Sequence, residues 1–503
     1  MLFNSFEYMI FLPIVFLLYW FVFDYLLKKS FLQLQLQNIF VVAASYVFYG
    51  WWNWRFLLLI VFTSLTSWFS GLLIRRSVHH SRLWLWCNVA LNLGILALFK
   101  YYNFFVSEFC RLFGLSADGM VIGVLLPVGI SFYTFQALSY SIDVYKHKIE
   151  PTHDIVAFFA YISFFPQLVA GPIERSTNLL PQFTRKRVFD YKMATDGMWQ
   201  ILWGLFKKIV IADNCAVFVD SVWAAPQAYT GSLVLWAAVL FALQIYCDFS
   251  GYSDIAIGTA KLFGISLKQN FATPYFSRDV AEFWRRWHIS LTTWFRDYVY
   301  IPLGGSRPEV SPQSNNPELH RKLIILRNTL VIFLLSGLWH GANWTFLLWG
   351  LYHALLFIPL ILMGKNRKYT NLVATQSDNG QLRLLPTWKE LGQMALTFGL
   401  IVFGWIIFRS PDIHTAGVFV QTLFSESLFV FRIPIDKYYC LRLFVPVVIM
   451  LVAEWLGRNK QFALQNIAQI LPNRWVRITI YALALVLVLI FRGKTAEFIY
   501  FQF

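Results

Sequence analysis

Charged residues are scarce in this chain: only 14% of its 503 residues are Asp, Glu, Lys or Arg, whereas soluble globular proteins carry about 25%. Hydrophobic residues make up 58% of the sequence, and the mean hydropathy is +0.56. Several apolar runs continue for about 20 residues, the length that a helix needs to cross a bilayer. The shortage of charge excludes a soluble or disordered chain and predicts an all-α, polytopic membrane protein.

Patterns for redox, metal and hydrolase chemistry are also lacking. The five cysteines are scattered and none belongs to a CxxC pair, so neither a disulfide framework nor a zinc knuckle is predicted. His79 and His80 are adjacent and diverge on a helix, and the chain has no HExxH motif, so we predict no metal site. GxSxG and Gly-rich phosphate loops are missing too, which disfavours soluble hydrolase and nucleotidase functions.

The net charge of +16 does not point to nucleic acid, because the basic residues lie in short loops between the apolar runs. Lys and Arg concentrate in cytoplasmic loops of membrane proteins, so we interpret the charge as a signal of topology and predict no nucleic-acid partner. A basic cytoplasmic rim would also attract anionic membrane lipids or a phosphate-bearing donor such as coenzyme A.

Some of the apolar runs are shorter than the roughly 20 residues needed to cross, so we expect about 11 transmembrane helices plus re-entrant and interfacial pieces. We expect one membrane-embedded domain over residues 1–503, with N-terminal spans in 1–260, an interfacial or cytoplasmic segment in 261–322 and C-terminal spans in 323–503. The candidate spans lie near residues 6–27, 38–50, 54–74, 83–99, 120–142, 154–170, 194–218, 231–258, 325–341, 344–363, 391–408, 440–456 and 475–491.

The run at residues 154–170 is predicted to be a re-entrant hairpin. A full crossing there would turn the following basic loop outward, against the distribution of positive charge expected in membrane proteins. Pro166, Gly171 and Pro172 favour a broken helix, which is tolerated at membrane depth only where it is buried in protein or lines a wet cavity.

Residues 261–322 interrupt the apolar runs, and their core at residues 282–305 alternates aromatic and basic side chains as an interfacial helix would. On one continuous helix, His288 shares a stripe with Arg285 and Thr292. Arg285 and its neighbour are planar cations able to contact donor phosphates, although anchoring at the lipid headgroups is an equally open alternative.

Two acids lie inside the apolar run at residues 231–258. Ionisable groups within spans are functional candidates, and Asp248 and Asp254 are separated by a polar stretch that includes Tyr252. They are predicted either to orient a catalytic group or pair with the arginines of residues 278–296, or to serve as hydrogen-bonded contacts between helices.

Two histidines of the C-terminal spans differ in their surroundings. His340 ends an apolar run and is followed by Gly341, Ala342 and Asn343, a turn that would expose its ring to a cavity. A buried imidazole stays neutral and can accept a proton, and general-base assistance of this kind is worth about 10²- to 10⁴-fold. His353 has no polar neighbours in the sequence, so a packing or hydrogen-bonded role is predicted.

Four ordered motifs resemble those of the membrane-bound O-acyltransferase family, in its bacterial alginate O-acetylation branch. They are GPIER at residues 171–175, YCDFSGYSDIAIG at 246–258, FWRRWHISLTTWFRDYVYIPLGG at 283–305 and GLWHGANWTFLLWG at 337–350.

This resemblance implies a ring of helices around a central funnel, in which a cytoplasmic acyl thioester, such as acetyl-coenzyme A, meets a histidine. No bound cofactor is expected. His340 matches the family's invariant histidine and is our candidate general base, with a transient acyl carrier as the alternative role. His288 matches the second histidine, facing the donor. Donor-binding or tunnel-lining roles are expected for Arg285, Arg286, Trp287, Asp248, Tyr252, Trp339 and Asn343.

We therefore expect an O-acetyltransferase of the bacterial inner membrane that passes an acetyl group across the membrane for O-acetylation of an exported polysaccharide. The resemblance implies an extracytoplasmic esterase-like acetyltransferase as partner, because the loops, under about 65 residues, are too short to hold such a domain. The alternative is a secondary transporter or flippase with a proton relay of Asp248, Asp254, His288 and His340. The absence of an internal repeat counts against it.

Overall fold

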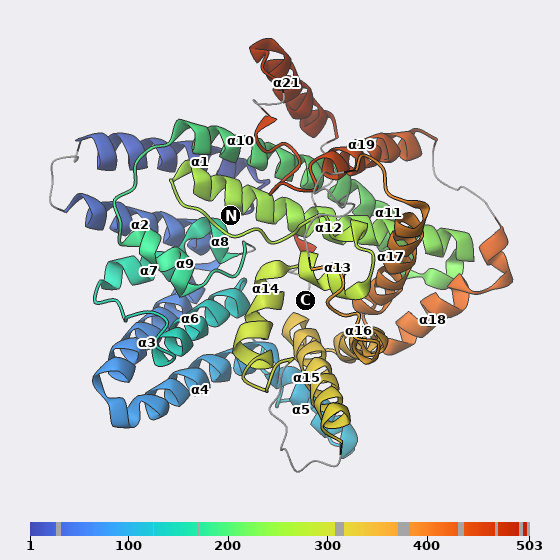
Figure 1. Cartoon of the computed structure of the whole chain (residues 1–503), viewed down its shortest axis with the longest axis horizontal. Helices are drawn as coiled ribbons and strands as arrows, with labels where there is room; N and C mark the ends of the chain where they lie inside the picture. The colour runs from blue at the N-terminus through green and yellow to red at the C-terminus, as the bar shows by residue number, and fades with distance from the viewer. Residues whose placement is uncertain are drawn as a thin grey trace. The chain divides into compact units, whose positions relative to one another are not determined.

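The computed structural model describes all residues of the chain except 27–31, 124, 170, 307–315, 371–382, 431–436, 468–470, 492–495 and 500–503. Every regular element in that described part is a helix (Figure 1), which confirms the predicted all-α class. The chain divides into two compact units: residues 1–201 with 252–268, and residues 202–251 with 269–503. The divisions fall within α10 (Tyr191–Leu205) and α12 (Gly231–Leu262).

Six described helical stretches are long and apolar enough to cross a membrane. The first of them contains both α2 (Gln33–Asn53) and α3 (Leu57–Arg76), and two shorter apolar stretches accompany the six. A polytopic membrane protein is therefore the architecture of this chain, whereas the figure of about 11 crossings stays a prediction. The six are Gln33–Arg76, Ser81–Lys100, Gly231–Leu262, Pro317–His340, Trp344–Leu362 and Trp388–Arg409, and the shorter two are Phe6–Val22 and Leu443–Leu456.

The first unit is built from short and long helices that pack closely. The close approach of α3 to α6 depends on Gly71, because a Cβ at this position would lie 2.5 Å from the ring of Tyr140. Besides α2 and α3, the unit contains α1 (Phe6–Leu17), α4 (Ser81–Lys100), α5 (Tyr102–Leu112), α6 (Ile130–Tyr145), α7 (Ile155–Ser163), α8 (Phe165–Leu168) and α9 (Ser176–Phe183).

Two predictions fall in this unit. A single span over residues 120–142 is wrong, because α6 begins only at Ile130, after Gly129 in the left-handed region (φ 74°). The broken helix near residues 154–170 is confirmed: the chain is extended at Phe164, between α7 and α8. The backbone N–H that follows the break donates to the Ser45 hydroxyl at 3.0 Å, so the interruption is satisfied inside protein, as it must be at membrane depth.

The second unit holds the remaining long helices. The predicted span at residues 194–218 is helical throughout, with α10 passing into a π-helical segment (Phe206–Ala212) before α11 (Asp213–Ala224). The other helices are α13 (Val280–Arg286), α14 (Ile289–Phe295), α15 (Pro317–His340), α16 (Trp344–Leu362), α17 (Trp388–Arg409), α18 (Ile413–Leu423), α19 (Lys437–Leu456) and α21 (Arg474–Ile490).

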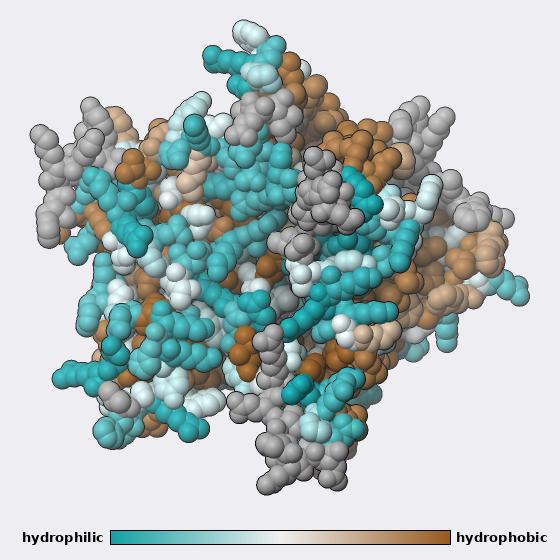
Figure 2. Space-filling model, viewed as in Figure 1, coloured by the Kyte–Doolittle hydropathy of each residue, from teal (hydrophilic) through white to brown (hydrophobic). Residues whose placement is uncertain are grey.

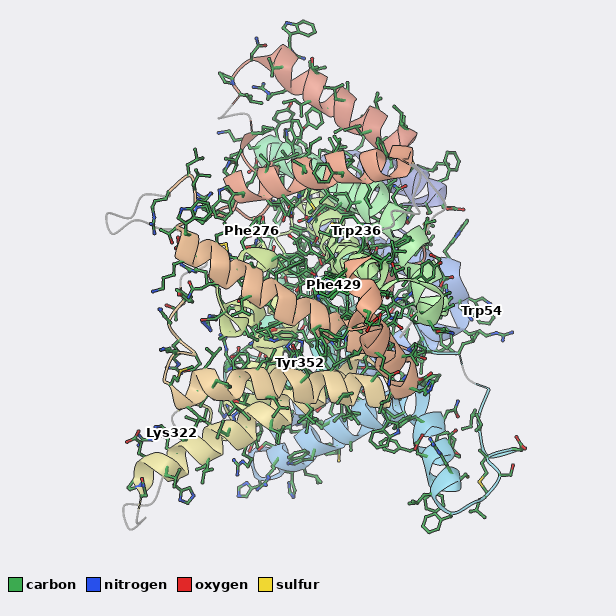
Figure 3. All side chains as sticks on the ribbon, turned by 90° about the vertical axis from the view of Figure 1, so that its right-hand side faces the viewer. Trp54, Trp236, Phe276, Lys322, Tyr352 and Phe429 are labelled. Atoms are coloured by element: carbon green, nitrogen blue, oxygen red, sulfur yellow. The ribbon has the colours of Figure 1, made fainter. Side chains whose placement is uncertain are left out.

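A hairpin of α15 and α16 forms the frame of this unit. Glycines allow the two helices to touch: a Cβ at Gly337 would collide with the carbonyl oxygen of Phe346, and one at Gly350 with that of Phe333. Figure 3 shows Lys322 near one end of α15 and Tyr352 midway along α16. The turn at the other end of the hairpin follows His340 directly.

The outer surfaces of α19 and α21 are apolar. Trp475 and Leu489 are 75% and 66% exposed, and Figure 2 shows hydrophobic side chains along these two helices. Large contiguous apolar surfaces are rare on soluble monomers but are required where a helix meets lipid. This unit therefore presents a lipid-facing surface.

Candidate active site

His340 is the last residue of α15, and its position is fixed by the turn into α16. The side chain is only 5% exposed. Aromatic rings surround the imidazole edge-on, with centroid distances of 5.0 Å to Trp339, 5.2 Å to Trp349 and 5.1 Å to Phe408. This surrounding holds the ring in one orientation and keeps bulk water away from it.

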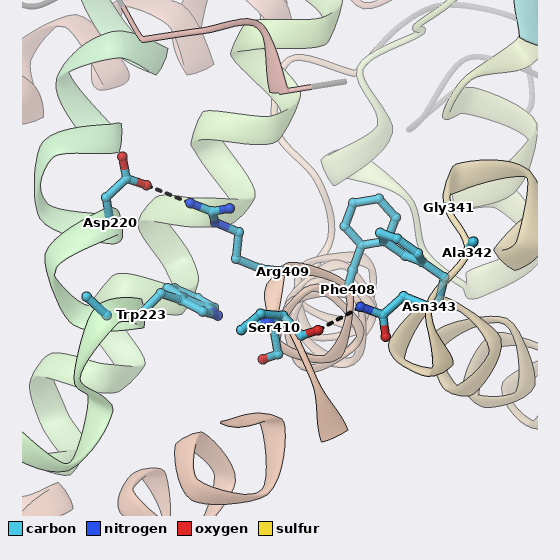
Figure 4. A pocket seen from close by; sticks show the side chains of 11 residues that line it. Asp220, Trp223, Gly341, Ala342, Asn343, Phe408, Arg409 and Ser410 are labelled. Carbon is cyan, nitrogen blue, oxygen red and sulfur yellow. Dashed lines mark hydrogen bonds and ion pairs between the residues drawn. The ribbon is translucent and has the colours of Figure 1, made fainter. Parts of the chain in front are cut away.

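A cavity of about 540 Å³ lies beside this histidine. Its walls include Phe346 and Phe408, and both rings contact His340. Figure 4 shows the cavity between α11, the end of α17 and the turn that follows α15. The predicted turn beside a cavity is thus present, because residues 341–343 line the cavity. His340 itself is not among the lining residues.

Asn343 joins two elements at the cavity wall. Its side-chain oxygen accepts the backbone N–H of Thr345 at 3.0 Å and caps α16, while its amide nitrogen donates to the carbonyl of Pro411 at 2.6 Å. Across the cavity, Arg409 pairs with Asp220 at 2.7 Å (Figure 4). The cavity therefore combines aromatic walls with polar side chains that are hydrogen-bonded or ion-paired.

His288 lies at a break between α13 and α14, with φ at 43°. The predicted continuous helix over residues 282–305, with Arg285 and His288 on one stripe, is wrong. The reason is a contact that is distant in sequence: the carbonyl of Asn270 accepts the N–H of Ile289 at 2.9 Å, and its side chain bonds to Ser290. These bonds stabilise the turn against helix continuation.

The same asparagine determines which nitrogen of His288 carries a proton. Its Oδ1 accepts the backbone N–H of Ser290, which can only donate, and it lies 3.1 Å from His288 Nδ1. Nδ1 must therefore donate, which leaves Nε2 as the basic nitrogen. Burial lowers the pKa of His288 to about 3, so the ring is neutral at cellular pH.

In the structure, both predicted histidines contact the side chain of Trp339. The Trp339 ring lies 5.7 Å from His288 and 5.0 Å from His340, measured between centroids. Three of the predicted site residues thus form one cluster within the second unit. This cluster, with the adjacent cavity, is the candidate active site.

Arg285 and Arg286, near His288, both bond to other residues of the protein. Arg286 is fully buried and pairs with Glu282 at 2.6 Å, so it is not at an interfacial surface. Arg285 is half-buried and donates to the carbonyls of Asn366 and Tyr369. A donor-contacting role for either arginine stays a prediction.

Two other predicted site residues have packing or ionic partners. Trp287 is buried against Phe283 and Trp405 at 5.5 and 4.9 Å. Asp248 pairs with Lys208 at 2.8 Å rather than with an arginine of residues 278–296, so that predicted pairing is wrong.

The rest of the predicted polar stretch belongs to the first unit. Tyr252 bonds to Asn4 there, and Asp254 accepts from Gln200. Asp254 is therefore one of the hydrogen-bonded contacts between helices that the sequence left open. His353 is fully buried among the rings of Trp284, Phe333, Trp349 and Tyr352, as its predicted packing role requires.

Sequence reasoning missed Asn270, Lys208 and the cavity wall at residues 408–411. No motif spacing singled out Asn270, although an amide next to an aromatic residue in a charged segment was the available signal. Lys208 lies within an apolar run, and ionisable residues in such runs are functional candidates. This rule could have identified Lys208.

Two buried histidines among aromatic walls, beside a cavity in a polytopic membrane protein, are the arrangement of a membrane enzyme able to take a proton from a hydroxyl group. A family model described as the membrane-bound O-acyltransferase family matches residues 14–379. The chain belongs to this family and is an O-acyltransferase, which confirms the resemblance of its four motifs.

The relatives agree with this assignment. A protein of Pseudomonas aeruginosa named probable alginate O-acetylase is 38% identical over 395 residues, covering 77% of this chain and 70% of the relative. The peptidoglycan O-acetyltransferase of Helicobacter pylori is 31% identical over 542 residues, covering 98% and 95%. The teichoic acid D-alanyltransferase of Bacillus subtilis is 25% identical over 57% of this chain and 69% of its own length.

Proposed function

We propose that this protein takes an acetyl group from a cytoplasmic thioester and transfers it toward a hydroxyl outside the membrane, for O-acetylation of an exported polysaccharide. Two similar proteins are named for acetylating alginate and peptidoglycan, which are both cell-envelope or exported glycans. The observation that carries the proposal is the buried His340 ring beside the cavity of about 540 Å³.

In the proposed reaction, the oxygen of the acceptor hydroxyl attacks the thioester carbonyl while His340 takes the proton of that hydroxyl. The carbon–sulfur bond then breaks, the ester forms, and the departing thiolate receives the proton from the imidazolium. His288, neutral and with Nε2 as its basic nitrogen, lies on the donor side. Aromatic walls exclude water, which would otherwise hydrolyse the thioester.

The distribution of charge in the second unit supports access from opposite sides. Basic residues gather where α15 begins, where α16 ends and where α17 begins, at Lys322, Lys365, Arg367, Arg383 and Lys389. Positive charge favours the cytoplasmic side. The opposite helix ends, with residues 341–343 and 409–411 around the cavity, then face outward.

This arrangement suits acetyl-coenzyme A, or another acyl thioester, as the donor, because phosphates are attracted to a basic cytoplasmic face. An extracytoplasmic esterase-like acetyltransferase would then complete the transfer to the polysaccharide. The bacterial inner membrane is the compartment where a cytoplasmic thioester and an exported glycan meet.

Purified protein in proteoliposomes, supplied with labelled acetyl-coenzyme A, tests the proposal. Free thiol should be released when an acceptor glycan or the partner is present, and label should appear in the acceptor. An intact donor under every condition would contradict the proposal and favour a transport function. Mass analysis of cell-surface glycans with and without the gene would identify the acceptor.

His340→Ala should abolish acetyl transfer, because the general base is lost, while expression and membrane insertion stay unchanged. His153→Gln is the control, since this histidine is exposed and does not line the cavity. Transfer should survive in His153→Gln. Retained polymer acetylation in His340→Ala would refute the assignment.

A further inference from the structure

Phe498 and Ile499 lie in the interior of the second unit, although they follow its last long helix. Before them in the same segment, Ala496 is partly exposed and Glu497 is exposed. Phe498 is fully buried and Ile499 is 1% exposed. Figure 1 shows this part of the chain, coloured red, beside α12. A short segment without regular helix gains such burial only if specific contacts fix its backbone.

Two buried charged groups provide those contacts. The N–H of Ile499 donates to Asp248 Oδ2 at 2.7 Å, and Lys208 Nζ donates to the carbonyl of Ala496 at 3.1 Å. Lys208 also bridges Asp248 and Asp213, at 2.8 Å to each. Since an unpaired buried charge is strongly unfavourable, this network fixes the segment in one position.

Aromatic contacts lead from the segment to the candidate active site. The Phe498 ring lies 6.0 Å from that of Phe249, the residue next to Asp248. The Phe249 ring in turn stands perpendicular to the His288 imidazole, with centroids 4.7 Å apart. Phe249 therefore contacts the segment and the histidine at once.

We propose that residues 496–499 form an internal brace that positions the His288 ring through Phe249, a function that rests on the proposed role of His288 in acetyl transfer. Phe498 is a positioning residue: it contacts a ring that contacts the histidine. Without it, Phe249 gains room to move and the imidazole loses one wall. Displacement of a catalytic group by about 1 Å costs up to about 10²-fold in rate.

Phe498→Ala and Phe498→Leu test the brace. In Phe498→Ala, kcat for acetyl transfer should fall about 10-fold or more, while KM for the thioester changes little. Phe498→Leu fills most of the lost volume and should restore most of kcat. A purely structural role would instead reduce the amount of folded enzyme and leave kcat per folded molecule unchanged.

Phe183→Ala is the matched control, because Phe183 is also fully buried but lies in the first unit, against Phe164 and Arg187. It should match the loss of thermal stability of Phe498→Ala and keep the wild-type kcat. Histidine-selective ¹⁵N NMR adds a readout that needs no activity: the His288 signal, assigned with His288→Gln, should shift or broaden only in Phe498→Ala.

An unchanged His288 signal, or a kcat loss no greater than in Phe183→Ala, would overturn the brace. Failure of the wild-type protein to transfer acetyl groups would refute the proposed function instead. In that case the His288 spectrum would still decide whether the brace holds the ring.

Discussion

At the scale of single residues, the surroundings of His288 determine both its charge and its orientation. The ring is 1% exposed and is held by the side chain of Asn270, so the charged form has no water to stabilise it. A neutral ring with one defined lone pair suits the proposed function, in which a thioester must be kept from water.

The lowered pKa of His288 predicts a pH dependence of stability. Between its ordinary value of 6.5 and about 3, the unfolded chain binds a proton that the folded protein does not. Stability should therefore fall as the pH falls through this window, by up to about 1.4 kcal/mol per unit. Thermal unfolding in detergent should show a weaker slope for His288→Gln than for the wild type.

His153→Gln is the control for this measurement, since His153 is exposed. It should keep the wild-type slope between pH 3 and 6.5. Equal slopes in wild type and His288→Gln would show that the His288 ring is not held neutral by burial.

At the scale of elements, the α15 and α16 hairpin carries the site. Gly337→Ala places a methyl group against the Phe346 carbonyl, so the helices must separate. We expect a loss of about 1–3 kcal/mol in stability, together with a loss of acetyl transfer because His340 is three residues away. Thermal unfolding and transfer assays would measure the two effects.

Gly399→Ala, inside α17, gives the comparison. A Cβ there meets nothing within 4 Å, so this change should be neutral or stabilise by about 0.5–1 kcal/mol. Similar destabilisation by both changes would mean that the effect comes from helical glycine in general and not from the contact between α15 and α16.

Periodicity and composition were enough to predict the apolar helices, the turn after His340 and the broken helix near Phe164. They failed at His288 because the local sequence favours a continuous helix, whereas Asn270, 18 residues earlier, stabilises a turn. The same limit hid the partner of Asp248: a spacing of acids within one helix does not reveal a lysine that lies 40 residues earlier, on another helix.

At the scale of the whole molecule, the proposed function requires two entrances, because in that proposal a thioester made in the cytoplasm meets an acceptor outside. The polar ends of α15, α16 and α17 suggest where the two entrances lie in the second unit. Their basic ends gather on one side, and the cavity beside His340 lies at their other ends. In the proposal, the histidine cluster lies between the entrance of the donor and that of the acceptor.

Cysteine labelling of intact cells tests this orientation. In a background without native cysteines, Asp412→Cys, next to the cavity wall, should react with a membrane-impermeant maleimide added outside, because Asp412 is exposed at the end where α17 leaves the membrane. Lys322→Cys, near the start of α15, should react only after the membrane is permeabilised. The reverse pattern would place the cavity on the cytoplasmic side, and the acceptor would then have to be a cytoplasmic molecule.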